Sequence, residues 1–307
     1  MRRRIRQFAE RCYERLLLAE LSETPSHVAV IQDGNRRYAE RQGAEATDGH
    51  RAGAETTEQL LRWCDELDID ELTLYAFSTE NFERPAAERE ALFDLVTRKL
   101  REFADNERVH EAGMRIHAIG ETGRLPERVQ DAIAYAQQRT AEHDTYQLNI
   151  ALAYGGRAEL LGATRKIARA VERGELDPAE VDTDTVETAL YDGPSRDVDL
   201  IVRSGGDERT SNFLPWQANG NEAAVYFSAP YWPAFRKIDL LRGIRTVEHR
   251  EQTRRWSRLQ RVHTFAGVAL DIAADSPALG RLRQALPGVT DQPTDRASEE
   301  GDTDPAD

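Results

Sequence analysis

Cysteine is scarce in this chain of 307 residues, which has only Cys12 and Cys64. Two cysteines cannot build a disulfide framework or a cysteine metal cage, so we expect a protein of the reducing cytoplasm. The sequence also lacks a run of 18 apolar residues, which argues against a membrane-spanning helix. Arginines follow Met1 as in a signal peptide, but charged residues interrupt the segment 10–15, and we therefore do not expect secretion.

Lysine is almost absent as well, with Lys99, Lys166 and Lys237 the only examples among 41 basic residues. The 55 acidic residues bring the formal net charge to −14, which argues against nucleic acid as a partner because two polyanions repel. An acidic, lysine-poor composition favours a halophilic protein from a high-salt cytosol. A GC-rich genome, which favours arginine codons, is the alternative explanation.

Several catalytic signatures are missing. The sequence contains no G-x-x-x-x-G-K-[ST] loop, no G-x-G-x-x-G after the first apolar run and no G-x-S-x-G elbow. It has neither the His and Cys spacing of a metal site nor the Asp-Asp-x-x-Asp pairs of all-helical prenyl synthases. These absences argue against a P-loop NTPase, a classical dinucleotide-binding protein and an α/β-hydrolase.

Short apolar runs alternate with helical segments from residue 25 onward. Strands are predicted at 28–31, 72–77, 114–119, 147–152, 200–202 and 225–227, and helices near 51–67, 86–108, 125–142, 157–173, 179–190 and 247–274. This alternation predicts a single α/β domain with a mostly parallel central sheet that helices cover on both faces.

The two ends of the chain differ from this pattern. Residues 1–24 are predicted to hold an amphipathic helix, whose basic end could touch anionic lipid or whose apolar stripe could pack on its own domain. We assign 25–275 to the main domain and 276–307 to an acidic tail, which we expect to be disordered because 291–307 holds seven acidic residues and almost no apolar ones.

Polar segments follow three of the predicted strands, at the edge where ligands gather in such sheets. The first is 32–38, in which Asp33 and Gly34 precede two arginines at a helix start. Capping explains the acid alone, but a helix start beside two arginines also attracts a diphosphate, and the carboxylate could hold Mg²⁺. The second is 78–85, where Ser78 or Asn81 could instead be a simple helix cap.

The third segment is 203–212, where a glycine pair lies between Arg203 and Arg209. Glycines let the backbone approach a ligand, and two arginines can clamp an anion. His50 follows Asp48-Gly49 at a helix start, where it could be functional or an ordinary surface residue.

Together these motifs resemble, in order, those of the cis-prenyltransferases, the undecaprenyl and dehydrodolichyl diphosphate synthases. The resemblance covers roughly 25–260 and is carried by 27–38, 49–53, 72–85 and 203–217, with 153–157 and 231–235 as further landmarks. It implies a six-stranded parallel sheet wrapped by helices, a hydrophobic tunnel and a homodimer. It also implies Mg²⁺-dependent condensation of isopentenyl diphosphate with an allylic diphosphate.

The resemblance also assigns roles by position. Asp33 is the carboxylate that engages Mg²⁺, and Asn81 holds the place of a proton acceptor, which we interpret as a relay or orienting group because an amide is a poor base. Glu222 falls at the second metal position, next to a two-residue displacement. The positions assigned to substrate binding are Gly34, Asn35, Arg36, Arg37, Tyr38, His50, Ser78, Thr79, Glu80, Phe82 and Arg84 for the allylic substrate, and Arg203, Arg209 and Ser211 for isopentenyl diphosphate.

Arg36 stands where bacterial members have glycine, and Ala46 replaces a bacterial arginine; the Asn-Arg-Arg-Tyr form resembles archaeal and eukaryotic members. We therefore expect a tritrans,polycis- or (2Z,6E)-type polyprenyl diphosphate synthase that makes the precursor of a glycosyl carrier lipid. Geranylgeranyl diphosphate is the expected primer and farnesyl diphosphate the alternative. The expected location is cytoplasmic, with peripheral membrane contact left open.

Two other functions are consistent with parts of the sequence. A non-catalytic partner subunit of a cis-prenyltransferase complex would keep the fold, although such subunits usually lose the aspartate and the diphosphate arginines. A generic Mg²⁺ phosphohydrolase would explain the acid and the arginines but not an apolar tunnel helix at 89–103. Product length is not predicted; this helix and Tyr146 are the places where it would be set.

Overall fold

The computed structural model describes residues 2–191, 197–220 and 223–251. The chain divides into two compact units, Leu17–Arg255 and a second unit of Met1–Leu16 with Trp256–Asp307, and the fold below is that of the first. The predicted N-terminal helix is present as α1, Arg2–Glu20. The acidic tail and most of the predicted helical region 247–274 lie outside the described residues. Every helix in the described part is too short or too polar to cross a bilayer.

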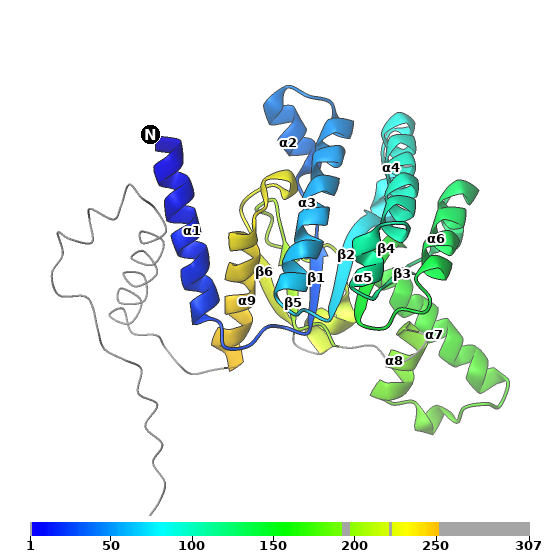
Figure 1. Ribbon diagram of the computed structural model, residues 1–307. Helices are drawn as coiled ribbons and strands as arrows, with labels where there is room; N and C mark the ends of the chain where they lie inside the picture. The colour runs from blue at the N-terminus through cyan, green and yellow to red at the C-terminus, as the bar shows by residue number, and fades with distance from the viewer. Residues whose placement is uncertain (1, 192–196, 221–222, 252–307) are drawn as a thin grey trace, which may run out of the picture. The chain divides into compact units, whose positions relative to one another are not determined.

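The described elements alternate as predicted (Figure 1). The strands are β1 His27–Ile31, β2 Glu71–Ser78, β3 Met114–Ile119, β4 Tyr146–Tyr154, β5 Leu200–Arg203 and β6 Ala224–Phe227. The helices after α1 are α2 Asn35–Gln42, α3 Ala46–Glu66, α4 Ala86–Ala104, α5 Glu107–Glu111, α6 Glu127–Arg139, α7 Gly156–Glu172, α8 Thr183–Tyr191 and α9 Lys237–Glu251.

The six strands form one parallel sheet in the order β3-β4-β2-β1-β5-β6. β1 lies inside the sheet, with Val28 paired to Leu72 of β2 and to Leu200 of β5. All five residues of β1 are buried, which explains why its sequence is a continuous apolar run rather than an alternating one. The expectation of a mostly parallel sheet is confirmed, and every pairing is parallel.

Apolar side chains cover the sheet on both faces. On one face α9 packs over β5 and β6, with Gly243 against Val202 and Leu200. Figure 1 shows α3, α4 and α6 side by side in front of the other strands. On the opposite face a buried cluster joins the sheet to the segment after β5: Ala29, Ile31, Ala151, Tyr154, Val198, Ile201, Phe213, Leu214 and Ala223.

The prediction of a single helix near 86–108 is wrong in one respect, because the segment forms two helices. α4 ends at Ala104, and α5 begins at Glu107 after Asn106, whose Oδ1 accepts a hydrogen bond from the Arg108 N–H at 3.0 Å. Asparagine favours such capping over a helix interior, so it ends one helix and starts the next. Within α4 the predicted tunnel residues divide: Leu92, Phe93, Leu100 and Phe103 are buried, whereas Leu95 and Val96 are partly exposed.

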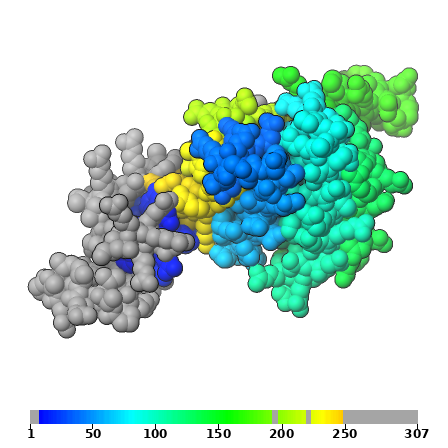
Figure 2. Space-filling model, turned by 90° about the horizontal axis from the view of Figure 1, so that it is seen from above, coloured from blue at the N-terminus to red at the C-terminus, as the bar shows by residue number. Residues whose placement is uncertain are grey.

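Because all strands run in one direction, their carboxyl ends lie at one edge of the sheet. The loops that leave β1, β2, β4 and β5 meet there, as parallel α/β sheets require of a ligand site. Figure 2 looks onto this edge, where α2 and the start of α3, in blue, lie between the yellow residues after β6 and the cyan residues of α4. The predicted polar segments are thereby brought together.

Candidate active site

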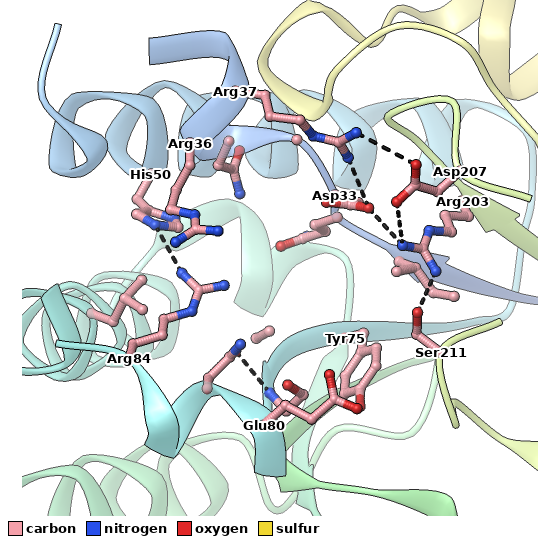
Figure 3. A pocket seen from close by; sticks show the side chains of 18 of the residues that line it. Asp33, Arg36, Arg37, His50, Tyr75, Glu80, Arg84, Arg203, Asp207 and Ser211 are labelled. Carbon is pink, nitrogen blue, oxygen red and sulfur yellow. Dashed lines mark hydrogen bonds and ion pairs between the residues drawn. The ribbon is translucent and has the colours of Figure 1, made fainter. Parts of the chain in front are cut away.

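A cavity of about 400 Å³ opens at this edge. It contains most of the residues that the sequence singled out: its lining is Ile31, Gln32, Asp33, Gly34, Asn35, Arg36, Arg37, His50, Tyr75, Ala76, Ser78, Glu80, Asn81, Arg84, Leu92, Arg203, Asp207, Arg209 and Ser211. Figure 3 shows that its arginines form two groups on different sides of the cavity.

The first group surrounds Asp33, directly after β1. Its Oδ2 lies 2.7 Å from Nη2 of Arg203 and 3.1 Å from Nη2 of Arg37. Burial raises the pKa of Asp33, but the hydrogen bond and charge of Arg203, with those of Arg37, outweigh it and leave the pKa below its usual value. The carboxylate is therefore ionised at neutral pH, and its contacts with Arg203 and Arg37 both fall on Oδ2.

Asp207 completes this group, and sequence reasoning gave it no role. Its carboxylate lies 3.5 Å from Arg37, 3.3 Å from Arg203 and 3.2 Å from Arg209. The sequence offered one sign of this role, because Asp207 lies in the glycine loop four residues after Arg203. Its third partner, Arg37, follows β1 and could not be found from that spacing. Three guanidinium groups are thus held by two carboxylates, which limits their mutual repulsion.

The two arginines of the third motif differ in environment. The side chain of Arg203 is 4% exposed, and its Nη1 donates to the carbonyl of Arg209 at 2.6 Å and to Oγ of Ser211. The side chain of Arg209 is 69% exposed. Arg203 is therefore a fixed group, whereas Arg209 can turn toward an incoming anion.

The second group consists of Arg36, His50 and Arg84, all facing Glu88 in the first turn of α4. Glu88 lies 2.6 Å from Arg84, 3.5 Å from His50 and 3.9 Å from Arg36, and its side chain is 12% exposed. Glu88 was absent from the predicted site. Arginine at the β2 exit and glutamate four residues later on the helix form an i,i+4 pair, which is the only sequence signal for this contact.

His50 is neutral in this arrangement. Burial lowers its pKa, the charge of Arg84 lowers it further, and the hydrogen bond to Glu88 acts in the opposite direction without reversing the shift. Arg84 lies 3.4 Å from Nε2 of His50 and can donate only to an unprotonated ring nitrogen. The second group therefore carries two arginine charges against one carboxylate.

Asn81 and Ser78 form a cap at the β2 exit. The Ser78 N–H donates to Oδ1 of Asn81 at 3.0 Å, and the Ser78 side chain accepts from the Asn81 backbone, as in a capping box. The capping interpretation from the sequence is thus correct as geometry, and both residues also line the cavity. The Ser78 N–H uses one of the two lone pairs of Oδ1, so Asn81 can still accept through this oxygen and donate through its NH₂.

Some predicted site residues lie outside the lining of this cavity. Tyr38 lines a neighbouring cavity with Arg41 and Tyr231, and Phe82 packs edge-on against Phe77 with ring centroids 5.1 Å apart. Thr79 lies beside Gly155, and Glu222 falls outside the described residues.

Of the two predicted metal ligands, only Asp33 lies within the described residues. The described residues contain no group of three His, Cys, Asp or Glu side chains arranged for a metal ion. Mg²⁺ commonly takes only one or two protein carboxylates and completes its shell with water and substrate phosphates. The ionised Asp33, with Oδ1 available beside the arginines, has the chemistry of such a ligand.

The fold and cavity define an α/β protein with two groups of arginines at one sheet edge, and the sequence comparisons identify its family. Residues 31–256 match the Prenyltransf model, described as that of undecaprenyl diphosphate synthase. The chain belongs to this family of prenyltransferases. The family resemblance drawn from the motifs is thus confirmed.

Two relatives are named tritrans,polycis-undecaprenyl-diphosphate synthase (geranylgeranyl-diphosphate specific). The protein from Haloarcula marismortui is 63% identical over 281 residues, covering 90% of this chain and 92% of the relative. The protein from Halobacterium salinarum is 56% identical over 300 residues, covering 97% and 98%. Both come from halophilic archaea, which agrees with the halophilic character predicted from composition.

Solved structures share the fold. Lavandulyl diphosphate synthase from Lavandula x intermedia, crystallised with dimethylallyl diphosphate, gives a TM-score of 0.69 at 33% identity and covers 76% of this chain and 98% of its own. A probable undecaprenyl diphosphate synthase from Campylobacter jejuni gives 0.60 at 32% identity and covers 76% and 99%. The expected cis-prenyltransferase fold is confirmed.

Proposed function

We propose that this protein elongates prenyl chains in cis by condensing isopentenyl diphosphate onto geranylgeranyl diphosphate, and that it releases a long-chain polyprenyl diphosphate, the precursor of a glycosyl carrier lipid. The observation that carries the proposal is the pair of arginine groups on different sides of one cavity, with Asp33 beside one of them (Figure 3). Two groups match a reaction with two diphosphate substrates. The names of the two halophilic relatives support geranylgeranyl diphosphate as primer.

The two groups have different parts in this proposal. Arg36, His50 and Arg84 bind the allylic diphosphate, and Arg203, Arg209 and Ser211 bind isopentenyl diphosphate. Asp33 and Arg37 lie at the β1 exit, and β1 stands between β2, which leads to Arg84, and β5, which leads to Arg209 and Ser211. Arg84, which Glu88 holds in place, and Arg36 stabilise the negative charge that grows on the departing allylic diphosphate.

The apolar part of the cavity suits the hydrocarbon of the substrates. Tyr75 and Ala76 of β2 line it beside Leu92 of α4, which continues into the buried Phe93 and Leu100 on the same helix. In this proposal the growing chain passes along α4. Asn81 orients a diphosphate oxygen through its NH₂ and does not take the proton, because an amide is a poor base.

Mg²⁺ is part of the proposal, with Asp33 as the ligand that this chain supplies at the β1 exit. When bound, the ion would neutralise charge on a diphosphate and make it a better leaving group. Asp33 is suited to hold it because the nearby arginines keep the carboxylate ionised while using only one of its oxygens. Glu222 stays a prediction as the second ligand.

The direct test is a chain-extension assay. Purified protein, Mg²⁺ and labelled isopentenyl diphosphate are incubated with geranylgeranyl, farnesyl or dimethylallyl diphosphate over a range of KCl concentrations, and products are separated by length. We expect extension to be fastest from geranylgeranyl diphosphate and to stop when EDTA removes Mg²⁺. Absence of extension from every primer at every salt concentration would refute the proposal.

The non-catalytic alternative is not favoured, because the aspartate and the arginines remain together in one cavity.

We further propose a homodimer in the cytoplasm that touches the membrane peripherally through the basic start of α1 to release its product. Sedimentation equilibrium tests the dimer. Co-sedimentation with anionic vesicles, compared with protein lacking residues 2–6, tests the membrane contact; equal binding of both proteins would exclude that segment.

A further inference from the structure

The segment after Arg209 has an unusual backbone. Ser211, Asn212 and Leu214 have φ angles of 49°, 59° and 45°, in the left-handed region that residues other than glycine rarely adopt. Asparagine tolerates this region better than most residues, whereas a run of such residues persists only when surrounding contacts hold it. The contacts of Asn212 show what holds this one.

Asn212 caps a helix that lies 55 residues earlier in the chain. α7 follows Gly155 and begins at Gly156, so its own N-terminus offers no side chain to accept the free N–H groups. The carbonyl of Asn212 accepts the Gly156 N–H at 2.8 Å, and its Oδ1 accepts the Arg157 N–H at 2.9 Å. One residue of the β5 exit therefore satisfies two donors at the β4 exit.

The two glycines make this approach possible. A Cβ on Gly156 would overlap Cδ of Pro215, and a Cβ on Gly155 would come within 2.8 Å of Oγ1 of Thr79 and 3.3 Å of Nδ2 of Asn212. Segments from the β2, β4 and β5 exits thus meet around Asn212. The close approach of these segments explains why Gly155 and Gly156 are both glycine, which N-capping of α7 alone would not require.

One neighbour of Asn212, Ser211, lines the cavity, and the other, Phe213, packs against Tyr75 of its wall. Ser211 accepts a hydrogen bond from Arg203 through Oγ. Phe213, fully buried, stacks on Tyr75 with ring centroids 4.5 Å apart and an interplanar angle of 8°. A change at Asn212 is therefore transmitted to a residue that holds Arg203 and to one that faces the apolar wall.

We propose that Asn212 is a positioning residue for isopentenyl diphosphate. By capping α7 from a distance it fixes Ser211 against Arg203, so that the anion meets a preformed site. The inference rests on the proposed function, specifically on isopentenyl diphosphate binding at Arg203 and Ser211. Asn212 itself needs no contact with substrate.

The test compares N212A, N212G and N212D with N106A as the matched control. Asn106 caps α5 through the same kind of Oδ1 contact but does not line the cavity. We expect N212A and N212G to raise KM for isopentenyl diphosphate about tenfold, the equivalent of one lost cap, with KM for the primer and kcat changed less than twofold. N212D keeps the acceptor and should regain most of this loss at high KCl, where its added charge is screened.

Glycine separates the two contributions of Asn212, since it adopts the left-handed backbone without strain but has no Oδ1. An N212G protein with the wild-type KM would overturn the capping role, and so would an N106A protein with the same rise in KM. If N212A does not fold, N212G and N212D still decide the question. A wild-type protein that extends no primer contradicts the proposed function instead, and calorimetric binding of isopentenyl diphosphate to wild type and N212G then tests Asn212 without turnover.

Discussion

Oδ2 of Asp33 lies 2.7 Å from Nη2 of Arg203, across the ends of the neighbouring strands β1 and β5. Arg203 is almost fully buried, so this carboxylate is both its counter-ion and the proposed metal ligand. Removal of the negative charge of Asp33 should therefore lower activity, and removal of its side chain should lower stability as well.

Asp33→Asn should lower kcat by at least about 100-fold, because the neutral amide neither holds Mg²⁺ nor balances the arginines. Asp33→Ala should in addition lower the free energy of unfolding, since Arg203 loses a buried partner. Steady-state kinetics and urea unfolding measure the two effects. The control is Asp48→Asn, whose ion pair with Arg51 is exposed; equal activity of the Asp33→Asn and Asp48→Asn proteins would rule out the role of Asp33.

Glu88→Gln should raise KM for the allylic primer about tenfold and leave KM for isopentenyl diphosphate unchanged. Glu88 is the common partner of Arg36, His50 and Arg84, and loss of a buried charged hydrogen-bond partner costs about 1 to 3 kcal/mol. Glu58→Gln is the control, because it removes an ion pair with Lys99 away from the cavity. Equal changes in both KM values would show that Glu88 does not act on one side only.

Glu159 should make stability depend on pH. Burial raises its pKa to about 7 from 4.5, although Tyr154 donates a hydrogen bond to it at 2.6 Å. Below pH 4.5 the carboxyl is protonated in both the folded and the unfolded protein and does not affect the free energy of unfolding. As the pH rises from 4.5 to 7, ionisation in the unfolded state lowers this free energy, and above pH 7 the loss stays constant at about 3 kcal/mol. Urea unfolding at pH 5 and pH 8 should thus show wild type losing about 2 to 3 kcal/mol relative to Glu159→Gln.

The control for this experiment is Glu175→Gln, which removes an exposed carboxylate whose pKa is lowered by Arg173. Its stability relative to wild type should not fall as pH drops from 8 to 5. A constant difference between wild type and Glu159→Gln across this range would mean that Glu159 ionises normally in the folded protein.

Two glycines of the same helix should respond in opposite ways to alanine. Gly156→Ala places a Cβ against Pro215 and should destabilise the protein by about 1 to 3 kcal/mol. Gly162→Ala meets open space and should stabilise it by about 0.5 to 1 kcal/mol, because alanine favours the helix. Thermal unfolding of both variants checks this. A stable Gly156→Ala protein would contradict the close approach of the 211–215 segment to α7.

Local patterns carried most of the fold. The apolar run 28–31 and its polar exit predicted a buried strand that leads to a ligand edge. The structure has this strand at His27–Ile31, and the prediction holds because a strand buried on both faces has consecutive apolar residues. Asn106 shows the limit of such patterns, since one capping side chain divided a stretch whose apolar spacing continued.

The candidate site was predictable to the extent that it lies in strand exits. Asp207 and Glu88 were missed because each also pairs with residues of another segment, Asp207 with Arg37 and Glu88 with His50 and Arg36. Local spacing does not reveal these partners. Asn81 shows the converse, since its capping role follows from the local sequence and is confirmed, and the same residue also lines the cavity.

Apart from Asp33 and Arg37 at the β1 exit, the members of the two arginine groups come from separate stretches of chain. Arg36, His50, Arg84 and Glu88 come from residues 36–88, whereas Asp207, Arg209 and Ser211 follow β5, and β1 alone stands between β2 and β5. Selection can therefore alter one stretch while the other is inherited unchanged. Separate change of the two stretches is consistent with similar proteins being named for different products, lavandulyl diphosphate in one and undecaprenyl diphosphate in another.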